Sequence, residues 1–227
     1  FKIQANMNPA HRDRIAFLRV CSGKFERGMA VNHVRSGKKV KLAQPQQFLA
    51  QDRDIVEVAY PGDIIGLHDP GTFRIGDTLC AENSFEFESL PQFSPEHFAR
   101  AINLNAMKYK QFQKGVTQLV EEGTIQVFRI ANRTEDLILG VVGQLQFEVF
   151  SFRLKAEYGA EIKLEPLPYQ LARWIKGDME VDPNRFTNLS SLCVHDQDGN
   201  PVVLCDNEFS LDWLQRQNPS LVFSEIS

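Results

Sequence analysis

Apolar positions along this chain follow two different spacings, one in each half. Between residues 14 and 78 they form short runs separated by glycine turns, which is typical of β-strands in a closed barrel or sandwich. The dipeptides Pro61-Gly62 and Pro70-Gly71 are turn signals that fit between such strands. The predicted strands are residues 15–20, 31–34, 40–42, 55–58, 64–67 and 73–75.

The second half shows helical spacing. One helix is predicted from the recurrence of Tyr109, Phe112, Val116, Leu119 and Val120, with Gly123 where a C-terminal cap belongs. A second helix is predicted over residues 144–158, followed by Gly159. One of its faces carries Leu145, Val149, Phe152 and Ala156, and a flank carries Phe147, Phe150 and Leu154.

Strand-like runs lie around the two helices, at residues 98–104, 125–130, 137–142 and 160–164. The order β-α-β-β-α-β predicts a ferredoxin-like antiparallel sheet with both helices on one face. The tail is expected to extend this domain. Its predicted elements are a strand at 169–175, a hairpin of 192–194 and 202–204 around Asp198-Gly199, a helix at 209–216 and a strand at 221–223.

These patterns predict two domains, a β-barrel over residues 1–88 and an α+β domain with a ferredoxin-like core over residues 89–227. Residues 85–95 read as a linker between them. The length of 227 residues and the hydrophobic share of 43% suit a globular chain of this size. No run approaches the roughly 20 apolar residues that a membrane span needs, so we expect no membrane partner.

Cysteine usage and the first residue suggest where the protein works. The four cysteines are widely spaced and contain no C-x-x-C, which argues against a disulfide framework and a cysteine-ligated zinc site. A reducing, cytoplasmic setting fits best. The chain begins with Phe1 and shows no export signal, so we expect a fragment whose front has been removed.

Charge is unevenly distributed. Residues 1–43 hold ten Lys and Arg but two acidic residues, a net of +8, although the whole chain has a net charge of −4. Such an end is a candidate surface for a polyanion, although charge alone favours ordinary solvation of a sheet edge. The candidate phosphate contacts lie on successive short strands and turns: Lys24, Arg27, Arg35, Lys38, Lys39 and Lys41, with His33 among them.

The motifs of common enzymes are missing from the sequence. A phosphate-binding loop needs G-x-x-x-x-G-K-[ST], and Ser36-Gly37-Lys38-Lys39 lacks both the earlier glycine and the following hydroxyl. Asp63-Ile-Ile-Gly66 resembles a nucleotide-binding D-x-x-G, but it reads as a turn entering a strand. Asp196-Gln-Asp198-Gly199 begins like a calcium loop, yet residue 207 is asparagine where a bidentate glutamate belongs, so a hairpin turn is predicted. No histidine spacing suits a metal, and no G-x-S-x-G is present.

We therefore assign no catalytic, cofactor-binding or metal-binding residue, and expect no enzyme activity from this chain. Binding remains, because Lys and Arg contacts to a phosphate backbone release condensed counterions. Phe17 and Phe25 alternate as core residues would, which makes backbone contact a better hypothesis than base reading.

Several strings, taken in order, resemble a known family. In the first half they are residues 1–9, 11–23, 59–67 and 75–78, which resemble the second, β-barrel domain of translational GTPases. In the second half they are residues 98–104, 119–123, 125–128, 140–147 and 153–159. Together they resemble the bacterial class II peptide chain release factors, the type three factors, over essentially the whole chain.

The resemblance implies that an amino-terminal GTPase domain, with GTP or GDP and Mg²⁺, precedes these two domains, which would be domains II and III. It implies a role in translation termination: a cytoplasmic monomer that contacts ribosomal RNA and protein and helps expel class I release factors after peptide release.

Three other readings stay open. An elongation-factor-G-like or ribosome-protection GTPase has similar domains. A cytosolic enzyme would place a small-molecule pocket between the domains. A free-standing RNA-binding adaptor would use the basic end alone.

Overall fold

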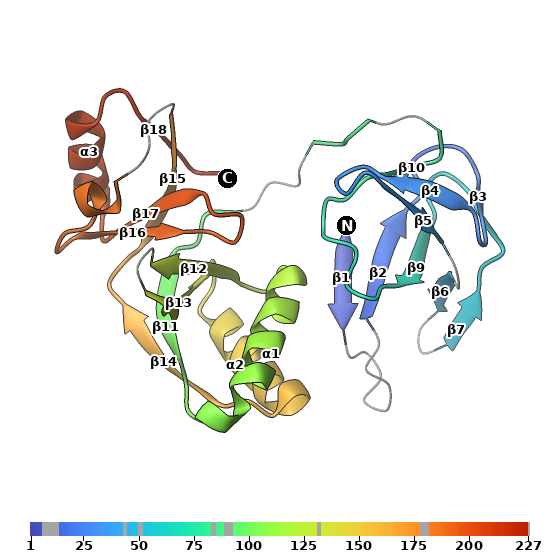
Figure 1. Cartoon of the computed structure of the whole chain (residues 1–227), viewed down its shortest axis with the longest axis horizontal. Coiled ribbons are helices and arrows are strands. Elements are labelled where there is room, and N and C mark those ends of the chain that lie inside the picture. Colours follow the sequence, from blue (N-terminus) through green and yellow to red (C-terminus); the bar gives the residue numbers. More distant parts are fainter. Residues whose placement is uncertain are drawn as a thin grey trace. The chain divides into compact units, whose positions relative to one another are not determined.

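The computed structural model describes residues 1–5, 14–42, 45–49, 52–82, 85–88, 93–130, 133–177 and 182–226 (Figure 1). The chain divides into two compact units. The first unit holds Phe1–Leu90 with Glu121–Gly123, and the second holds Pro91–Val120 with Thr124–Ser227. Each unit has a hydrophobic core of its own.

The first unit is a β-barrel built from short antiparallel strands. Its strands are β1 (Lys2–Ala5), β2 (Arg14–Arg19), β3 (Phe25–Glu26), β4 (Ala30–His33), β5 (Lys38–Lys41), β6 (Gln46–Leu49), β7 (Asp52–Ile55), β8 (Val58–Ala59), β9 (Ile64–His68) and β10 (Leu79–Cys80). They pair in the orders β1-β2-β9-β6-β7, β10-β4-β5 and β3-β8. Alternate residues face inward, and Phe25, Val31, Ile65 and Leu67 meet in the core.

Two of the strands predicted for this unit are wrong. Residues 73–75 form no strand, because side-chain carboxylates take backbone N–H groups there: Asp69 Oδ1 accepts from Phe73, and Asp77 Oδ2 accepts from Arg74. Residues 55–58 are not one strand either. The chain passes there from β7, which pairs with β6, to β8, which pairs with β3. Patterning also missed β1, β3, β6 and β10, which are short.

The second unit is an α+β fold around one long sheet. Its helices are the 3₁₀ segment η1 (Ala106–Lys108), α1 (Tyr109–Glu121), α2 (Leu145–Tyr158), the 3₁₀ segment η2 (Pro183–Phe186) and α3 (Glu208–Gln217). Its strands are β11 (His97–Asn103), β12 (Gln126–Ile130), β13 (Arg133–Val141), β14 (Ile162–Leu167), β15 (Leu171–Lys176), β16 (Ser191–His195), β17 (Pro201–Cys205) and β18 (Val222–Ser224).

The predicted β-α-β-β-α-β order is confirmed. The four strands pair antiparallel in the order β14-β11-β13-β12, with α1 and α2 in the crossovers. The tail extends this sheet through a contact of Arg129 on β12 with His195 on β16 and continues as β17, β15 and β18. The hairpin around Gly199, which has a φ of +86°, also lies where it was predicted.

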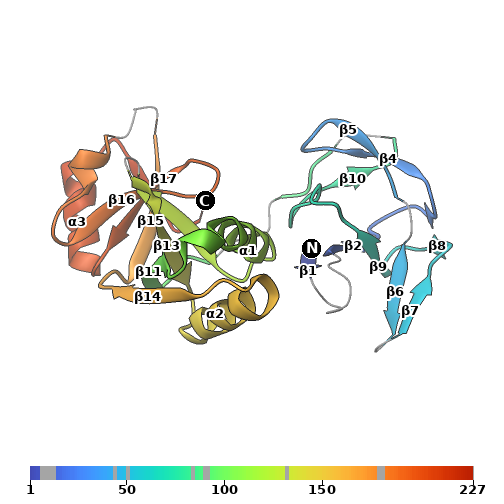
Figure 2. The same ribbon diagram turned by 60° about the horizontal axis from the view of Figure 1, so that its bottom comes forward.

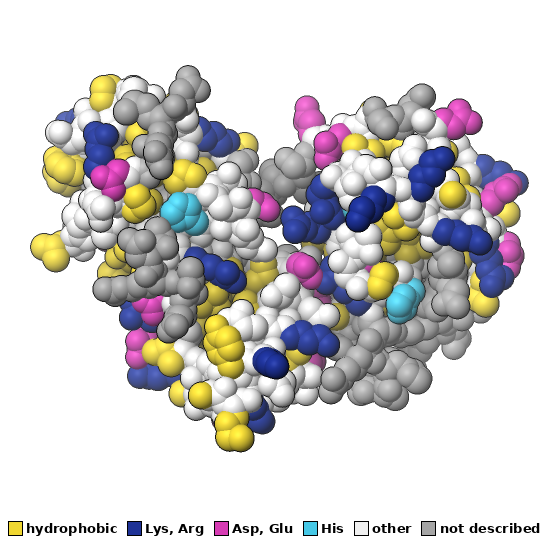
Figure 3. All heavy atoms as spheres, in the orientation of Figure 1, with side chains coloured by type: hydrophobic (Ala, Val, Ile, Leu, Met, Phe, Trp, Pro, Cys, Tyr) yellow, Lys and Arg dark blue, Asp and Glu magenta, His cyan; other side chains and the backbone are white. Residues whose placement is uncertain are grey.

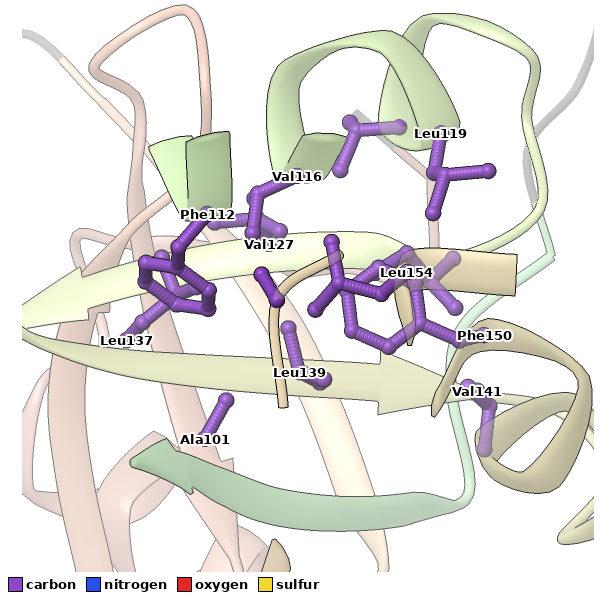
Figure 4. Packing of buried hydrophobic residues seen from close by; sticks show 13 residues of the cluster. Ala101, Phe112, Val116, Leu119, Val127, Leu137, Leu139, Val141, Phe150 and Leu154 are labelled. Atoms are coloured by element: carbon purple, nitrogen blue, oxygen red, sulfur yellow. The ribbon is translucent and has the colours of Figure 1, made fainter. Parts of the chain in front are cut away.

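Both helices cover the same face of the sheet (Figure 2). Phe112, Val116 and Leu119 of α1 point toward the sheet, as do Phe150 and Leu154 of α2 (Figure 4). The sequence showed two apolar rows on α2, and the structure buries the flank. The other row, Leu145, Val149, Phe152 and Ala156, is exposed to solvent.

No helix in the described part of the chain is long and apolar enough to cross a membrane.

Candidate nucleic-acid interface

The hairpin of β4 and β5 carries the largest group of predicted contact residues. Its turn depends on Gly37, whose φ of +64° is a conformation that glycine adopts easily. The N–H of Gly37 donates to the carbonyl of His33 at 2.9 Å. The register pairs His33 with Lys38 and Ala30 with Lys41. The three lysines therefore lie along one short strand that starts at the turn.

Lys39 and Lys41 project away from the barrel core. They alternate with Val40, which packs against the core, so the pleat turns both lysines toward solvent. Lys38 is exposed beside the turn. Among the described residues, no carboxylate pairs with any of these three ammonium groups. They can therefore meet a negatively charged partner without first giving up an ion pair with a described residue.

Two of the other predicted cations are held in surface ion pairs. Lys24 Nζ lies 2.8 Å from Glu26, and Arg27 Nη1 lies 2.7 Å from Glu57. The Lys24 and Arg27 side chains are 49% and 42% exposed. Pairs as exposed as these are weak, because water screens both charges. Lys24 and Arg27 can thus exchange their carboxylates for phosphates at little cost.

Arg35 is fixed by a mostly buried carboxylate, that of Asp77. Its Nε donates to Oδ1 at 2.5 Å and its Nη2 to Oδ2 at 2.9 Å, a two-point contact. The ring of His33 approaches Oδ2 at 2.7 Å, and the N–H of Arg74 donates to the same oxygen at 2.7 Å. Burial opposes ionisation of Asp77, but these hydrogen bonds outweigh it and lower its pKa below the ordinary aspartate value. Asp77 therefore ties the hairpin to the segment that precedes β10.

The inclusion of His33 among the exposed cations was wrong. Its side chain is 0% exposed, and both ring nitrogens are engaged, by Asp77 and by the hydroxyl of Ser36 at 2.9 Å. A ring in this position supports the hairpin and cannot reach a polyanion. Sequence reasoning gave Asp77 no role. Its position in the string Ile75-Gly-Asp-Thr78 was the available signal, but the two side chains that it holds, those of His33 and Arg35, lie more than 40 residues away.

The aromatic residues of the first unit differ in burial, and the side chains of Phe1, Tyr60, Phe85 and Phe87 are each about half exposed. Phe25 is buried in the core, as predicted. Phe17 is half-buried, and Lys2 Nζ stands 5.7 Å from its ring centre. On the face shown in Figure 3, Lys and Arg side chains lie across the first unit, whereas acidic side chains lie toward its edges.

A pocket of about 560 Å³ opens in the first unit. Its lining comes from residues 1 to 88 alone and includes the apolar side chains of Leu18, Phe25, Met29, Val31 and Leu42. The pocket therefore belongs to the barrel by itself.

Two motif interpretations are confirmed. Asp63 accepts a hydrogen bond from the N–H of Tyr60 at 2.8 Å and leads into β9, so Asp63-Ile-Ile-Gly66 is a turn and a strand. Asp196 accepts from the N–H groups of Asp198 and Asn200 at 3.0 and 2.8 Å and from Trp174 Nε1 at 2.9 Å, which is a hairpin turn. Across the described ranges, no three His, Cys, Asp or Glu residues are grouped to hold a metal.

Comparisons with known proteins agree with this architecture. The family described as "Elongation factor G domain 2" matches residues 1–82, and the family described as "Class II release factor RF3, C-terminal domain" matches residues 87–215. A crystal structure of a protein from Thermus thermophilus shares the fold, with a TM-score of 0.61 and 21% identity over 78% of this chain and 28% of that one.

Curated relatives are more similar. The protein named "Peptide chain release factor 3" from Symbiobacterium thermophilum is 58% identical over 98% of this chain and 42% of its own length. The proteins of the same name from Microcystis aeruginosa and Listeria welshimeri are each 51% identical over 100% of this chain, and over 42% and 43% of their own lengths.

The fold and these matches define a translation-factor chain, a β-barrel followed by a ferredoxin-like domain. The chain belongs to the class II release factor RF3 family. It spans less than half the length of the curated relatives that it matches.

Proposed function

We propose that this chain is the ribosome-contacting part of a translational GTPase that stimulates GTP-dependent dissociation of class I release factors during translation termination. The observation that carries the proposal is the 58% identity, over 98% of the chain, to a protein named peptide chain release factor 3. In this reading residues 1–88 are domain II and residues 89–227 are domain III of a cytoplasmic protein.

GTP, GDP and Mg²⁺ would be bound elsewhere in the whole protein. Nucleotide binding needs a glycine-rich loop followed by Lys and a hydroxyl residue, and this sequence contains no such loop. The residues of this chain therefore do not fit the nucleotide, and we expect them to hydrolyse no GTP. The two units would contribute ribosome binding and transmit movement. Each is a compact body that can bind ribosomal RNA or protein while another part of the molecule changes its conformation.

Lys38, Lys39 and Lys41 are the best candidates for the RNA contact. Their side chains are exposed and have no ion-pair partner within the described ranges, and the turn and the Asp77 contacts hold the strand that carries them. Lys24 and Arg27 would join after exchanging their surface carboxylates. Arg35 would act mainly through the hairpin, because Asp77 already occupies its guanidinium.

The test is co-sedimentation of the chain with 70S ribosomes over a series of salt concentrations. Replacing Lys38, Lys39 and Lys41 by Ala should weaken binding. It should also make the slope of log affinity against log salt concentration shallower by roughly 2–3, since each lost phosphate contact changes that slope by about 0.7–0.9. The matched control replaces Lys110, Lys114 and Lys176, three exposed lysines of the second unit, and removes the same charge.

Equal weakening by both triple variants would mean that net charge, not the hairpin, governs binding. A ribosome affinity that does not change with salt concentration would contradict an RNA contact. A parallel GTP-hydrolysis assay of the same sample should show no turnover, and magnesium-dependent hydrolysis that follows the purified chain would contradict our assignment of nucleotide chemistry to another part of the protein.

A further inference from the structure

The pocket in the first unit reaches the hydrophobic core of the barrel. Four of its lining residues belong to that core: Val20, Phe25, Val31 and Leu42. Its volume of about 560 Å³ lies inside the roughly 300–1,000 Å³ that is usual for small-molecule sites. The apolar body of a small molecule would therefore be removed from water there, which favours binding.

Two aromatic rings form a corner in the lining of this pocket. The ring centroids of Phe85 and Phe87 lie 5.1 Å apart, their planes meet at 78°, and each side chain is about half exposed. The N–H of Phe87 donates to Thr78 Oγ1 at 3.2 Å, and Cys80 Sγ donates to the carbonyl of Phe85 at 3.5 Å. These two contacts hold the rings beside the barrel. Aromatic rings in such a position attract cations, because the face of the ring is negative.

The charged side chains that line the pocket add to this preference for cations. Lys24 is already paired with Glu26 at 2.8 Å. Asp77 is already paired with Arg35 at 2.5 Å. The other charged lining residues are exposed and form no ion pair with a described residue: Arg19, Glu82 and Glu88. Acids therefore outnumber bases two to one in this unpaired group, and both acids lie on the segment that carries the two rings.

We propose that this pocket binds a small organic cation with an apolar or aromatic body, such as a quaternary ammonium compound. The body would lie against the apolar lining, and the ammonium group would lie at the rings of Phe85 and Phe87, where Glu82 and Glu88 supply negative charge. An anion of the same shape would be repelled by those two carboxylates. The proposal concerns the barrel alone and does not rest on the proposed ribosomal role.

Three probes of similar shape test the class of ligand: the cation naphthylmethyl-trimethylammonium, the neutral naphthalenemethanol and the anion naphthalenesulfonate. The NMR signal of the Met29 methyl group reports binding, because Met29 lines the pocket. Met107, which is 92% exposed in the second unit, is the internal control. The cation should shift the Met29 signal and leave the Met107 signal unchanged, with a dissociation constant on the order of 1 mM. It should bind about tenfold more tightly than the anion.

Cys21 gives an independent measurement of occupancy. Its thiol is exposed and lines the same pocket. Saturation with the cation should slow the alkylation of Cys21 by iodoacetamide, a neutral reagent, whereas the anion at the same concentration should leave the rate unchanged. If the cation does not protect Cys21, or if it shifts the Met107 signal as much as the Met29 signal, the proposal is wrong.

Two substitutions separate recognition of the ammonium group from burial of the apolar body. Phe87→Leu keeps an apolar side chain but removes the ring face, and Glu88→Gln removes one carboxylate charge. Each should weaken binding of the cation roughly two- to fivefold and leave the affinity for the neutral alcohol nearly unchanged.

The matched controls are Phe93→Leu and Glu86→Gln. Phe93 is 77% exposed in the second unit, and Glu86 is an exposed acid of the same segment that does not line the pocket. Neither control should change the affinity for the cation. Equal losses for the cation and the alcohol in Phe87→Leu and Glu88→Gln, or equal losses in the controls, would overturn the assignment of a cation site.

Discussion

Gly115 on α1 touches α2 so closely that a Cβ atom at position 115 would overlap Leu154 and lie 2.8 Å from Tyr158 Cγ. This is the point at which the two helices of the second unit cross. The hydrophobic spacing of α1 could not show it, because glycine contributes nothing to an apolar row. The crossing brings Phe112 and Val116 down onto the sheet beside Phe150.

Gly115→Ala should destabilise the second unit. The added methyl group forces Leu154 and Tyr158 to move, at a cost of about 1–3 kcal/mol. This exceeds the roughly 1 kcal/mol that alanine gains over glycine inside a helix. Urea unfolding followed by the fluorescence of Trp174 and Trp213, both in this unit, measures the change.

The control is Gly143→Ala, because a Cβ at position 143 would meet nothing closer than 4.0 Å. That variant should unfold at nearly the parent urea concentration. If Gly115→Ala is equally stable, the helices can separate at the crossing without cost, and the close approach is not a constraint on the fold.

Asp77→Asn should destabilise the barrel and loosen the lysine hairpin. The change removes the charge that Arg35 faces and leaves one fewer acceptor for His33 and Arg74, at a cost of about 1–3 kcal/mol. The pKa of Asp77 is lowered in the folded state, so its contribution is present above the unfolded-state pKa near 4 and is lost as the pH falls through the lower folded value. The parent barrel should therefore lose stability below about pH 4, and the variant should lose less over the same range.

Hydrogen exchange of the β4 and β5 amides measures the loosening at neutral pH. Glu82→Gln serves as the control, since Glu82 is an exposed acid of the same unit. Unchanged exchange in Asp77→Asn would show that Gly37 and the strand pairing hold the hairpin without the carboxylate.

The four cysteines should differ sharply in reactivity. Cys21 is exposed, whereas Cys80, Cys193 and Cys205 are buried. Burial, reinforced by Asp182, raises the pKa of Cys193 to about 11, and burial, reinforced by Asp206, raises that of Cys205 to about 12. A thiol reagent at pH 8 should therefore modify Cys21 first, and Cys21→Ser should remove the fast phase. Fast modification of a second thiol in the folded Cys21→Ser protein would contradict the packing around the buried cysteines.

The same pKa shifts predict alkaline sensitivity. In the unfolded chain these thiols ionise near pH 8.5. In the folded state Cys193 and Cys205 stay protonated to about pH 11 and 12. The unfolded state therefore loses protons first, and the free energy of unfolding should fall as the pH rises from about 8.5 toward 11. Urea unfolding at a series of pH values measures this fall, and a flat profile over that range would contradict it.

The sequence by itself determined the local structure of the second unit. Hydrophobic periodicity and glycine positions were sufficient to predict helices α1 and α2 and the glycines that follow them, Gly123 and Gly159. They also predicted the β-α-β-β-α-β order and the hairpin at Gly199, because each of these features depends on residues that are near one another in the chain. In the first unit the strand predicted at residues 40–42 overlaps β5, but the observed strand, Lys38–Lys41, begins two residues earlier, directly after the turn.

Contacts between distant residues were decided by the tertiary structure alone. Residues 73–75 look like a strand, yet the carboxylates of Asp69 and Asp77 accept hydrogen bonds from the N–H groups of Phe73 and Arg74. Six cations look equivalent in the sequence, yet Asp77 holds Arg35 while Lys38, Lys39 and Lys41 pair with no carboxylate of the described residues. Helix α2 has two apolar rows, and only the sheet beneath it selects Phe150 and Leu154 for burial. In each case the pattern shows which residues could be buried or paired, but the partner that selects among them comes from elsewhere in the chain.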